Sequence, residues 1–368
     1  MRVAIVLNTS WNIFNFRMGL VRQLLSENHT VFAIAPCDTY SKLLTEAGCN
    51  YVPVKMDSRG ANVIKDLGLM VELLLIYNRI KPDIIFHFTI KPNVYGSIAA
   101  RLLGIPMINN VCGLGTVFLT NNLTSKIALI LYKFSFKFPD KVFFQNKDDR
   151  EKFVKLKLIR ETKADLVPGS GIDLMEFTPS VKNEKTTLTF LMISRLIIDK
   201  GILEYVKAAE ILKKNGIDAV FQLVGPSDIE HKRGISHDVI DNWSCTLNVD
   251  YLGKQNNIQP FIAKADCIVL PSYREGTPRT LLEAAGMAKP IIATNVPGCT
   301  NVVFDHENGY LCNLKDPKDL ADKMLKFSRL SAAERTRMGN RGRRIVEELF
   351  DEKIVIRSYV NAMSVILK

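Results

Sequence analysis

Short apolar runs rich in β-branched residues alternate with longer amphipathic stretches along the whole chain. The apolar runs are typical of buried strands, and the stretches between them have apolar residues at helical spacing. The predicted strands cover residues 3–7, 30–35, 51–54, 84–88, 107–111, 141–145, 187–193, 219–224, 249–252, 267–270 and 290–293. The predicted helices cover residues 16–26, 40–47, 64–79, 93–103, 202–215, 258–263, 279–288 and 317–329. Strand–helix–strand order of this kind predicts a parallel sheet with helices on both faces.

This pattern runs through once and then starts again, which predicts two doubly wound, Rossmann-like domains of the α/β class. Residues 168–185 collect Gly, Pro and Ser between the two halves, so we expect the junction there. The predicted domains are 1–168 and 169–349. A last helical stretch, 350–368, has no strand after it, and we expect it to pack back on the first domain.

The composition narrows the class of protein. With 368 residues, 47% hydrophobic and 24% charged, the chain is typical of a globular protein with room for two cores. Its seven Cys lack any C-x-x-C pairing, which argues for a reducing compartment and against a disulfide or zinc framework. The net charge of +11 fits a nucleic acid, an anionic membrane surface or an acidic small-molecule substrate as partner, and also fits a merely solvated surface.

The apolar segments are too short or too interrupted for a signal peptide or a membrane-spanning helix. Residues 121–163 nevertheless carry 11 basic and 5 acidic residues. Within them, 123–138 interleaves aromatic and aliphatic side chains with lysines, as a helix lying in the headgroup plane of an anionic membrane does. The alternative is a core helix whose lysines face solvent.

Ligands of a doubly wound sheet bind outside the carboxyl ends of its strands, so the residues after each strand carry the candidate chemistry. The turn after the first strand lacks the G-x-G-x-x-G pattern, which counts against a nicotinamide oxidoreductase. A basic residue follows that turn, and a His, a Lys and a glycine-containing turn follow the fourth and fifth strands. The candidates in this half are Arg17, His87, Lys91, Gly113, Gly115 and Thr116. Each has a structural alternative as a turn, cap or core residue.

In the second half, two basic residues follow the first predicted strand. Ser194 and Arg195 end a predicted strand, and Lys200 precedes Gly201 at the start of the next helix. Two cations beside a helix N-terminus form a pocket for a diphosphate, whose charge is spread over several oxygens. Either base alone is typical of a solvated residue beside a turn, so the interpretation depends on what the next loop contains.

That loop follows the predicted strand 267–270 and contains Glu275, with Glu283 eight residues later in the next helix. A carboxylate accepts paired hydrogen bonds from vicinal hydroxyls, such as those of a ribose or a hexose. The backbone N–H groups of Gly276, Thr277 and Arg279 can meet a phosphate at the same helix N-terminus. The two carboxylates can therefore address different ends of one ligand.

These motifs resemble the donor half of glycosyltransferase family 4, a GT-B group of retaining enzymes that use nucleotide sugars. The similarity covers nearly the whole chain, and residues 87–116 are similar to a bacterial subgroup that extends lipid-linked oligosaccharides, including N-acetylgalactosaminyltransferases that act on undecaprenyl-diphosphate-linked bacillosamine. Many relatives follow Pro-Gly-Cys with Arg and an acid, whereas Thr300-Asn301 stand here, which puts a role for that loop in doubt. The matching motifs are Ser194-Arg195, Lys200-Gly201, Glu275-Gly276-x-Pro278, Glu283-Ala284, 296–299 and 307–309.

The resemblance implies two Rossmann-like domains that face each other across a cleft, with the acceptor on the first and the nucleotide sugar on the second. It implies that Arg195 and Lys200 hold the donor diphosphate and stabilise the leaving nucleotide. Glu283 would bind the ribose hydroxyls, and Glu275 would lie against the transferred sugar. The rest of the implied donor site is Ser194, Gly276, Thr277, Pro278 and Arg279.

On the first domain, the resemblance implies that His87 is the residue nearest the reacting sugar. The remaining candidates of that domain would lie on the acceptor or sugar side. The implied reaction is the retaining transfer of a hexose-type sugar, such as the N-acetylhexosamine GalNAc, from a UDP-sugar to a polyprenyl-diphosphate-linked saccharide in bacterial surface glycan or protein glycosylation. The implied mechanism needs no enzyme nucleophile, because the leaving oxygen helps to deprotonate the acceptor.

We predict no metal and no cofactor. No two Asp have the D-x-D spacing that holds a metal in many sugar transferases of the other major fold, and Arg195 and Lys200 can supply the metal's charge. The predicted partners are the UDP-sugar, the lipid-linked acceptor and an anionic membrane surface that binds residues 121–163. The predicted location is the cytoplasm, peripheral on the inner face of the cytoplasmic membrane.

Two alternatives remain open at this point. A UDP-sugar 2-epimerase shares the two-domain architecture, although the paired bases and carboxylates favour transfer. A non-enzymatic nucleic-acid binder would need a concentrated basic face with exposed aromatics. About half of the bases alternate with acids instead, so we expect no nucleic-acid partner.

Overall fold

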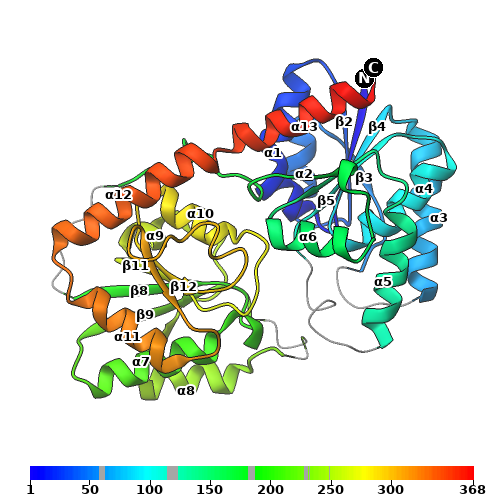
Figure 1. The fold of residues 1–368 in the computed structure, drawn as a ribbon. Coiled ribbons are helices and arrows are strands. Elements are labelled where there is room, and N and C mark those ends of the chain that lie inside the picture. The colour runs from blue at the N-terminus through cyan, green and yellow to red at the C-terminus, as the bar shows by residue number, and fades with distance from the viewer. Residues whose placement is uncertain (58–62, 114–122, 181–186, 228–230, 232, 248) are drawn as a thin grey trace. The chain divides into compact units, whose positions relative to one another are not determined.

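The computed structural model describes residues 1–57, 63–113, 123–180, 187–227, 231, 233–247 and 249–368. These residues form two compact units, Met1–Ser170 with Glu352–Lys368, and Gly171–Asp351 (Figure 1). The division falls inside the segment 168–185, which the sequence marks by its Gly, Pro and Ser residues. The C-terminal helix α13 (Glu352–Ile366) is part of the first unit.

The first unit is built on a seven-stranded parallel sheet with the order β3-β2-β1-β4-β5-β6-β7. Its central strands are buried on both faces, which explains why they are continuous apolar runs in the sequence. The strands are β1 (Arg2–Val6), β2 (Thr30–Ala35), β3 (Asn50–Pro53), β4 (Ile84–Phe88), β5 (Met107–Val111), β6 (Lys141–Phe144) and β7 (Ala164–Leu166).

Helices cover both faces of this sheet (Figure 1). On one face, α1 and α13 share a buried cluster with the strands that includes Leu20, Phe86 and Tyr359. On the other face, α3 and α4 form a second cluster, which includes Tyr77 and Ala99. The helical elements are α1 (Ser10–Ser26), α2 (Ser41–Glu46), α3 (Val63–Ile80), the π-helical turn η1 (Pro92–Gly96), α4 (Ser97–Leu102), α5 (Leu123–Ser135), α6 (Lys147–Lys155), the 3-10 turn η3 (Glu161–Lys163) and α13.

The second unit repeats this architecture on a six-stranded parallel sheet with the order β10-β9-β8-β11-β12-β13. One core cluster lies under α7, α8 and α11, and the other under α9, α10 and α12. The strands are β8 (Leu188–Ile193), β9 (Ala219–Val224), β10 (Val249–Tyr251), β11 (Cys267–Leu270), β12 (Ile291–Thr294) and β13 (Gly309–Cys312). The helical elements are η4 (Ile198–Lys200), α7 (Ile202–Lys214), α8 (His237–Leu247), α9 (Gln259–Lys264), α10 (Arg279–Gly286), α11 (Pro317–Ser328) and α12 (Ala332–Leu349).

The strand order of each sheet reverses at one place, between β1 and β4 in the first unit and between β8 and β11 in the second. At such a point the two connections leave toward opposite faces of the sheet, and a crevice opens outside the strand ends. The loops after these four strands are therefore where the topology favours a ligand.

The predicted α/β class and the doubly wound sheets are confirmed, and the predicted strands lie within about one residue of those observed. The sequence patterns missed the short edge strands β7 and β13, and also the helices α6 and α8. The basic segment 335–344 is helical and lies inside α12. These elements are short or strongly polar, so their hydrophobic periodicity is weak.

Candidate active site

Most of the predicted donor residues lie on the two loops that follow β8 and β11, at the strand-order reversal of the second unit. Arg279 and Glu283 lie in the next helix, α10. Gly201 is the point where these loops touch. Its φ of 75° is left-handed, and a Cβ there would lie 2.0 Å from the carbonyl oxygen of Pro271. Only glycine fits this backbone contact, so the chain needs Gly after Lys200 to bring the two loops together.

An ion pair joins the two loops directly. The Nζ atom of Lys200 lies 2.5 Å from Oε1 of Glu275, and the two side chains are 22% and 12% exposed. The sequence predicted both residues as donor ligands but did not predict that they pair. The pair holds a cation and a carboxylate in one fixed place, with part of each side chain still accessible.

A third loop packs against the loop that carries Glu275. Gly298, after β12, has a φ of 87°, and a Cβ there would lie 2.4 Å from the carbonyl oxygen of Gly276 and 2.6 Å from that of Glu275. The backbone of the 296–299 turn therefore presses on the backbone of the Glu275 loop. Thr300-Asn301 depart from the family pattern, which puts a direct ligand contact of this turn in doubt. The packing of Gly298 on the Glu275 loop does not depend on those two residues.

Two helix N-termini lie at the same edge of the sheet. Helix α7 begins after Gly201 and α10 begins after Pro278, and neither N-terminus has a side-chain cap within the described part of the chain. Helix N-termini present N–H groups and a positive dipole end to an anion. Thr277 is buried next to Pro278, while Arg195 is exposed, directly after β8.

Glu283 lies in α10, one turn after Arg279. The Nε atom of Arg279 donates to Oε1 of Glu283 at 3.1 Å, and its Nη1 donates to the carbonyl oxygen of Gly171 at 3.2 Å. Burial raises the pKa of the Glu283 carboxyl, and the Arg279 guanidinium opposes that rise. The sequence predicted a backbone role for Arg279 and missed its side-chain role, although the spacing of four residues on a helix favours this pair.

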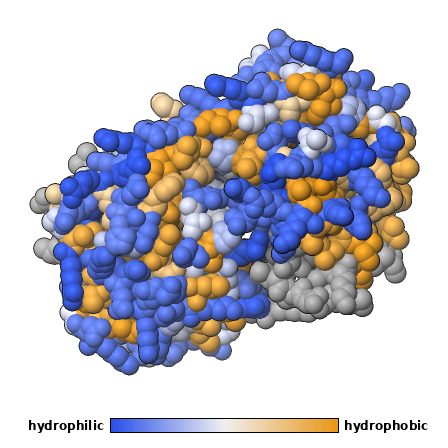
Figure 2. Space-filling view, viewed as in Figure 1, coloured by the Kyte–Doolittle hydropathy of each residue, from blue (hydrophilic) through white to orange (hydrophobic). Residues whose placement is uncertain are grey.

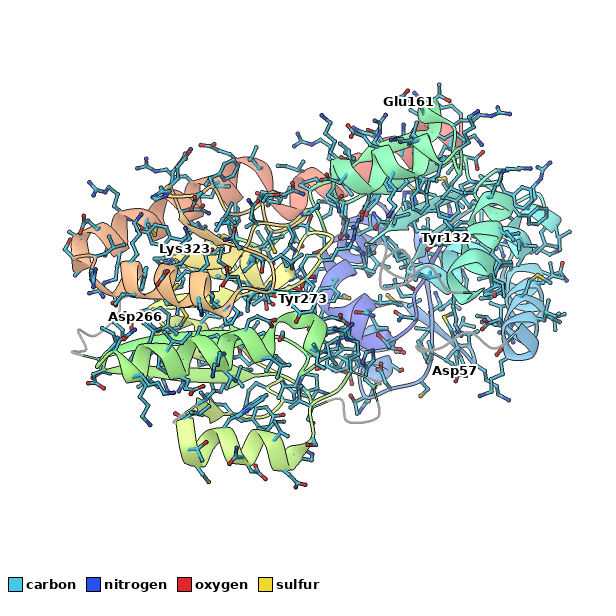
Figure 3. All side chains as sticks on the ribbon, turned by 60° about the horizontal axis from the view of Figure 1, so that its bottom comes forward. Asp57, Tyr132, Glu161, Asp266, Tyr273 and Lys323 are labelled. Atoms are coloured by element: carbon cyan, nitrogen blue, oxygen red, sulfur yellow. The ribbon has the colours of Figure 1, made fainter. Side chains whose placement is uncertain are left out.

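Tyr273, labelled in Figure 3, is a loop residue that sequence reasoning missed. Its hydroxyl donates to Oε1 of Glu204 at 2.8 Å, and its backbone N–H donates to the carbonyl oxygen of Asp199 at 2.9 Å. Burial and the Glu204 carboxylate raise the pKa of Tyr273. These bonds tie the Glu275 loop to η4 and α7, so Tyr273 positions the loop that carries Glu275.

In the first unit, the structure contradicts the predicted contact between His87 and the reacting sugar. His87 is 0% exposed, and its Nε2 and Nδ1 atoms lie 2.9 Å from the Tyr77 hydroxyl and 3.0 Å from Oδ1 of Asn109. Burial lowers its pKa to about 4, so the ring is neutral. Both ring nitrogens are thus occupied inside the core, and His87 is a packing residue that links β4, α3 and β5.

The other candidates of this unit fall in different places. Lys91 pairs with Asp66 at 2.7 Å, and the Tyr95 hydroxyl donates to the same carboxylate at 3.2 Å, so the charge of Lys91 is neutralised there. Arg17 is buried and lies next to Cys112. Gly113, which follows Cys112, has a φ of 138°. Gly115 and Thr116 lie outside the described residues.

Comparison with known families decides the class of this protein. Residues 2–146 match the family Glycosyl transferase 4-like, and residues 175–345 match the family Glycosyl transferases group 1. The chain belongs to the group 1 glycosyltransferases. Each family match lies within one of the two units described above, and the predicted donor residues from Ser194 to Glu283 lie in the group 1 match.

The glycosyltransferase has relatives among enzymes that act on lipid-linked sugars. It is 28% identical over 386 residues, 100% of both chains, to the N,N'-diacetylbacillosaminyl-diphospho-undecaprenol alpha-1,3-N-acetylgalactosaminyltransferase of Campylobacter jejuni. It is 27% identical over 279 residues, 70% of this chain and 69% of the relative, to the UDP-Gal:alpha-D-GlcNAc-diphosphoundecaprenol alpha-1,3-galactosyltransferase of Escherichia coli.

Solved structures show the same fold. HepE from Anabaena, in complex with UDP and glucose, matches 99% of each chain with a TM-score of 0.81 and 16% identity. Sucrose-phosphate synthase from Thermosynechococcus elongatus matches 100% of this chain and 99% of its own, with a TM-score of 0.82 and 16% identity. The glycosyltransferase therefore has the GT-B architecture, and as a member of its family it is a hexosyltransferase.

Proposed function

We propose that this glycosyltransferase transfers an N-acetylhexosamine such as GalNAc from its UDP-sugar, with retention of configuration, to a saccharide linked to a polyprenyl diphosphate. The observation that carries the donor part is the Lys200–Glu275 ion pair at the strand-order reversal of the second unit, beside two helix N-termini. The named activities of the two lipid-linked sugar transferases support the acceptor part.

In this proposal the second unit binds the donor through its own fixed groups. The diphosphate meets Arg195, Lys200 and the N-termini of α7 and α10. Lys200 can keep its contact with Glu275 and still reach a phosphate oxygen, because an ammonium has three donors. Glu283 accepts from the ribose hydroxyls through Oε2, which has no partner among the described residues, while Arg279 holds Oε1.

The chemical step follows from these contacts. The bond between the anomeric carbon and the diphosphate oxygen breaks, and the acceptor oxygen bonds to the same face of that carbon. The acceptor proton passes to the departing diphosphate oxygen, so no enzyme nucleophile is consumed. Arg195, Lys200 and the helix N-termini stabilise the charge that develops on the leaving UDP, and Glu275 orients the sugar. These groups supply the charge that a metal would otherwise supply, so we propose metal-independent transfer.

We further propose that the enzyme is peripheral on the cytoplasmic face of an anionic membrane. No helix in the described part of the chain is long and apolar enough to cross a membrane. Helix α5 has an exposed apolar row, Ile127, Ile130 and Phe134, and Lys133 and Lys137 are exposed beside it. Tyr132, labelled in Figure 3, is buried, so the amphipathic helix packs its other face on the core.

A second apolar row extends this surface. Leu67, Val71 and Leu75 are exposed at every fourth position of α3. Helices α3 and α5 both pack against η1, and Figure 2 shows hydrophobic residues on the side of the view where these helices lie in Figure 1. Two exposed apolar rows with lysines nearby are the features of a surface that enters the headgroup region of an anionic membrane.

The decisive experiment is a transfer assay with purified enzyme and a panel of UDP-hexoses and UDP-N-acetylhexosamines. The acceptor is a saccharide linked to a short polyprenyl diphosphate, and product configuration is read by NMR. We expect one UDP-N-acetylhexosamine to be consumed with retention. Formation of an epimer of the donor without acceptor would instead identify a 2-epimerase, and inversion would contradict the mechanism.

Site variants connect the activity to the geometry. Arg195→Ala removes a charge from the donor site, and we expect a folded protein with a rate at least about a hundredfold lower, the effect of losing one preorganised donor. Arg329→Ala is the matched control, because Arg329 is exposed at the end of α11, outside the site. Equal activity of the two variants would show that the site is elsewhere.

A further inference from the structure

Arg17 is a buried cation for which the described residues supply no counter-charge. It lies in α1, which follows β1, and it is only 4% exposed. Among the described residues no carboxylate lies within 4 Å of its guanidinium, and its Nε atom has no hydrogen-bond partner. Arginine stays protonated in proteins, so this charge is present in the folded state.

The contacts that Arg17 does make are weak. Its Nη1 donates to the carbonyl oxygen of Phe16 at 3.1 Å, its Nη2 lies 3.8 Å from Sγ of Cys112, and its Cζ lies 4.3 Å from the Phe88 ring centroid. A sulfur, one carbonyl and a ring face compensate a buried charge far less than a carboxylate does. Residues 114–122, which follow Gly113, contain no Asp or Glu.

The position of Arg17 matches that of the donor site in the other unit. Arg17 follows β1 and packs on Phe88 at the end of β4, and these two strands flank the strand-order reversal of the first sheet. Thr89 directly follows Phe88, and its Oγ1 is buried with no hydrogen-bond partner in the described part of the chain. Arg17 Nε and Thr89 Oγ1 are therefore two buried donors without a partner among the described residues, and they belong to segments that follow β1 and β4, where a doubly wound sheet binds its ligand.

We propose that Arg17 binds a phosphoryl group of a substrate, so that the first unit has its own anion site. An anion restores the missing counter-charge, and the guanidinium fork suits phosphate oxygens. The source of the phosphoryl group is the diphosphate of the lipid-linked acceptor, and only this part of the inference rests on the proposed function. The phosphoryl contact itself can be measured without transfer.

The test is a set of binding measurements on the full chain. With UDP at saturation to occupy the donor site, inorganic pyrophosphate should bind the wild type, and Arg17→Met should weaken that binding about tenfold or more, as expected for a lost charge-assisted bond. Farnesyl diphosphate should behave in the same way, and farnesol should show no difference between the two proteins. Arg22→Met, an exposed arginine of the same helix, should bind pyrophosphate as the wild type does.

The source of the phosphoryl group is read from the UDP affinity. If Arg17→Met leaves UDP binding unchanged, the acceptor supplies the group; if it weakens UDP instead of farnesyl diphosphate, the donor supplies it. Without ligand we expect Arg17→Met to melt no lower than the wild type, because it removes an uncompensated buried charge. Arg17→Lys keeps the charge without the fork and should bind with intermediate affinity. Unchanged affinity of the folded Arg17→Met or Arg17→Lys variant for all the phosphorylated probes would overturn the proposal, whatever the outcome of the transfer assay.

Discussion

The Lys200–Glu275 ion pair allows a sharp separation of stability from catalysis. At 2.5 Å and an effective dielectric constant of about 20, two unit charges attract by roughly 7 kcal/mol before desolvation. The side chains are 22% and 12% exposed, so the pair lies between a surface bridge, worth about 0–1 kcal/mol, and a buried one, whose rupture costs about 3–5 kcal/mol. We therefore expect Glu275→Gln and Lys200→Met each to lower the free energy of unfolding by about 1–2 kcal/mol.

The double variant tests the coupling. Lys200→Met with Glu275→Gln leaves neither charge unpaired, so its loss of stability should be smaller than the sum of the two single losses by about 1 kcal/mol or more. Urea unfolding of the four proteins measures this. Catalysis should respond differently, because both groups contact the donor in the proposed mechanism: each single variant should lose about a hundredfold or more in kcat, and the double variant should regain none of it.

One matched variant controls for the general cost of breaking an ion pair. Glu210 pairs with Lys207 and Lys214 on the outside of α7, so Glu210→Gln breaks comparable bridges away from the site. It should leave kcat unchanged. Strict additivity of the two stability losses, or wild-type turnover of Glu275→Gln, would refute the reasoning that this pair is the fixed centre of the donor site.

Three further predictions concern the membrane, the metal and His87. Lys133→Glu with Lys137→Glu should lower binding to anionic liposomes about tenfold or more, since each lysine near the surface contributes about 1 kcal/mol, whereas Lys213→Glu with Lys264→Glu on the second unit should not. EDTA should leave the transfer rate unchanged, and added magnesium should not raise it. His87→Gln should keep its activity at neutral pH. The pKa of His87 is about 4 in the folded wild type and 6.5 in the unfolded chain, so the unfolded chain binds more protons as the pH falls. Acidification from pH 6.5 to 4 should therefore destabilise the wild type by about 3 kcal/mol more than this variant.

Each of these has a clear contrary result. Equal liposome binding by the two pairs of lysine variants would remove α5 from the membrane surface. Loss of activity in EDTA that magnesium restores would show a metal requirement. A large loss of kcat in a stable His87→Gln protein would return His87 to the site, and identical pH profiles of unfolding would show that His87 is not buried as a neutral ring.

The fold could be predicted from the sequence because parallel strands buried on both faces are short continuous apolar runs. That pattern is visible at β4 and β8, for example, without any knowledge of tertiary structure. Helix α6 could not be predicted in the same way, because its sequence, KDDREKFVK, has almost no apolar row. It depends instead on the cap at Asn146 and on Phe153, its one buried apolar residue.

The candidate donor residues could be proposed from the sequence because the ends of strands are where such sheets bind ligands. What the sequence could not show is how those residues meet. Lys200 and Glu275 come together only because β8 and β11 are neighbours in the sheet, and strand order is a tertiary property. The prediction for His87 was wrong for the same reason. Its place near a strand end favours a site, but its ring is held by the tertiary contacts with Tyr77 and Asn109.

Gly298 offers a final test of whether the third loop positions Glu275. Gly298→Ala places a side chain at a φ of 87°, within 2.4 Å of the carbonyl oxygen of Gly276. Gly253→Ala is the matched control, because Gly253 has a φ of 71° but nothing within 4 Å of a Cβ. Urea unfolding should show a loss of about 1–2 kcal/mol for Gly253→Ala from the left-handed backbone, and a larger loss for Gly298→Ala, because its Cβ must also displace the carbonyl groups of Glu275 and Gly276. Only Gly298→Ala should also lower kcat, by about tenfold or more, because a small displacement of the Glu275 loop misplaces a donor ligand. Equal kcat values for the two variants would mean that the 296–299 turn supports the fold and not the site.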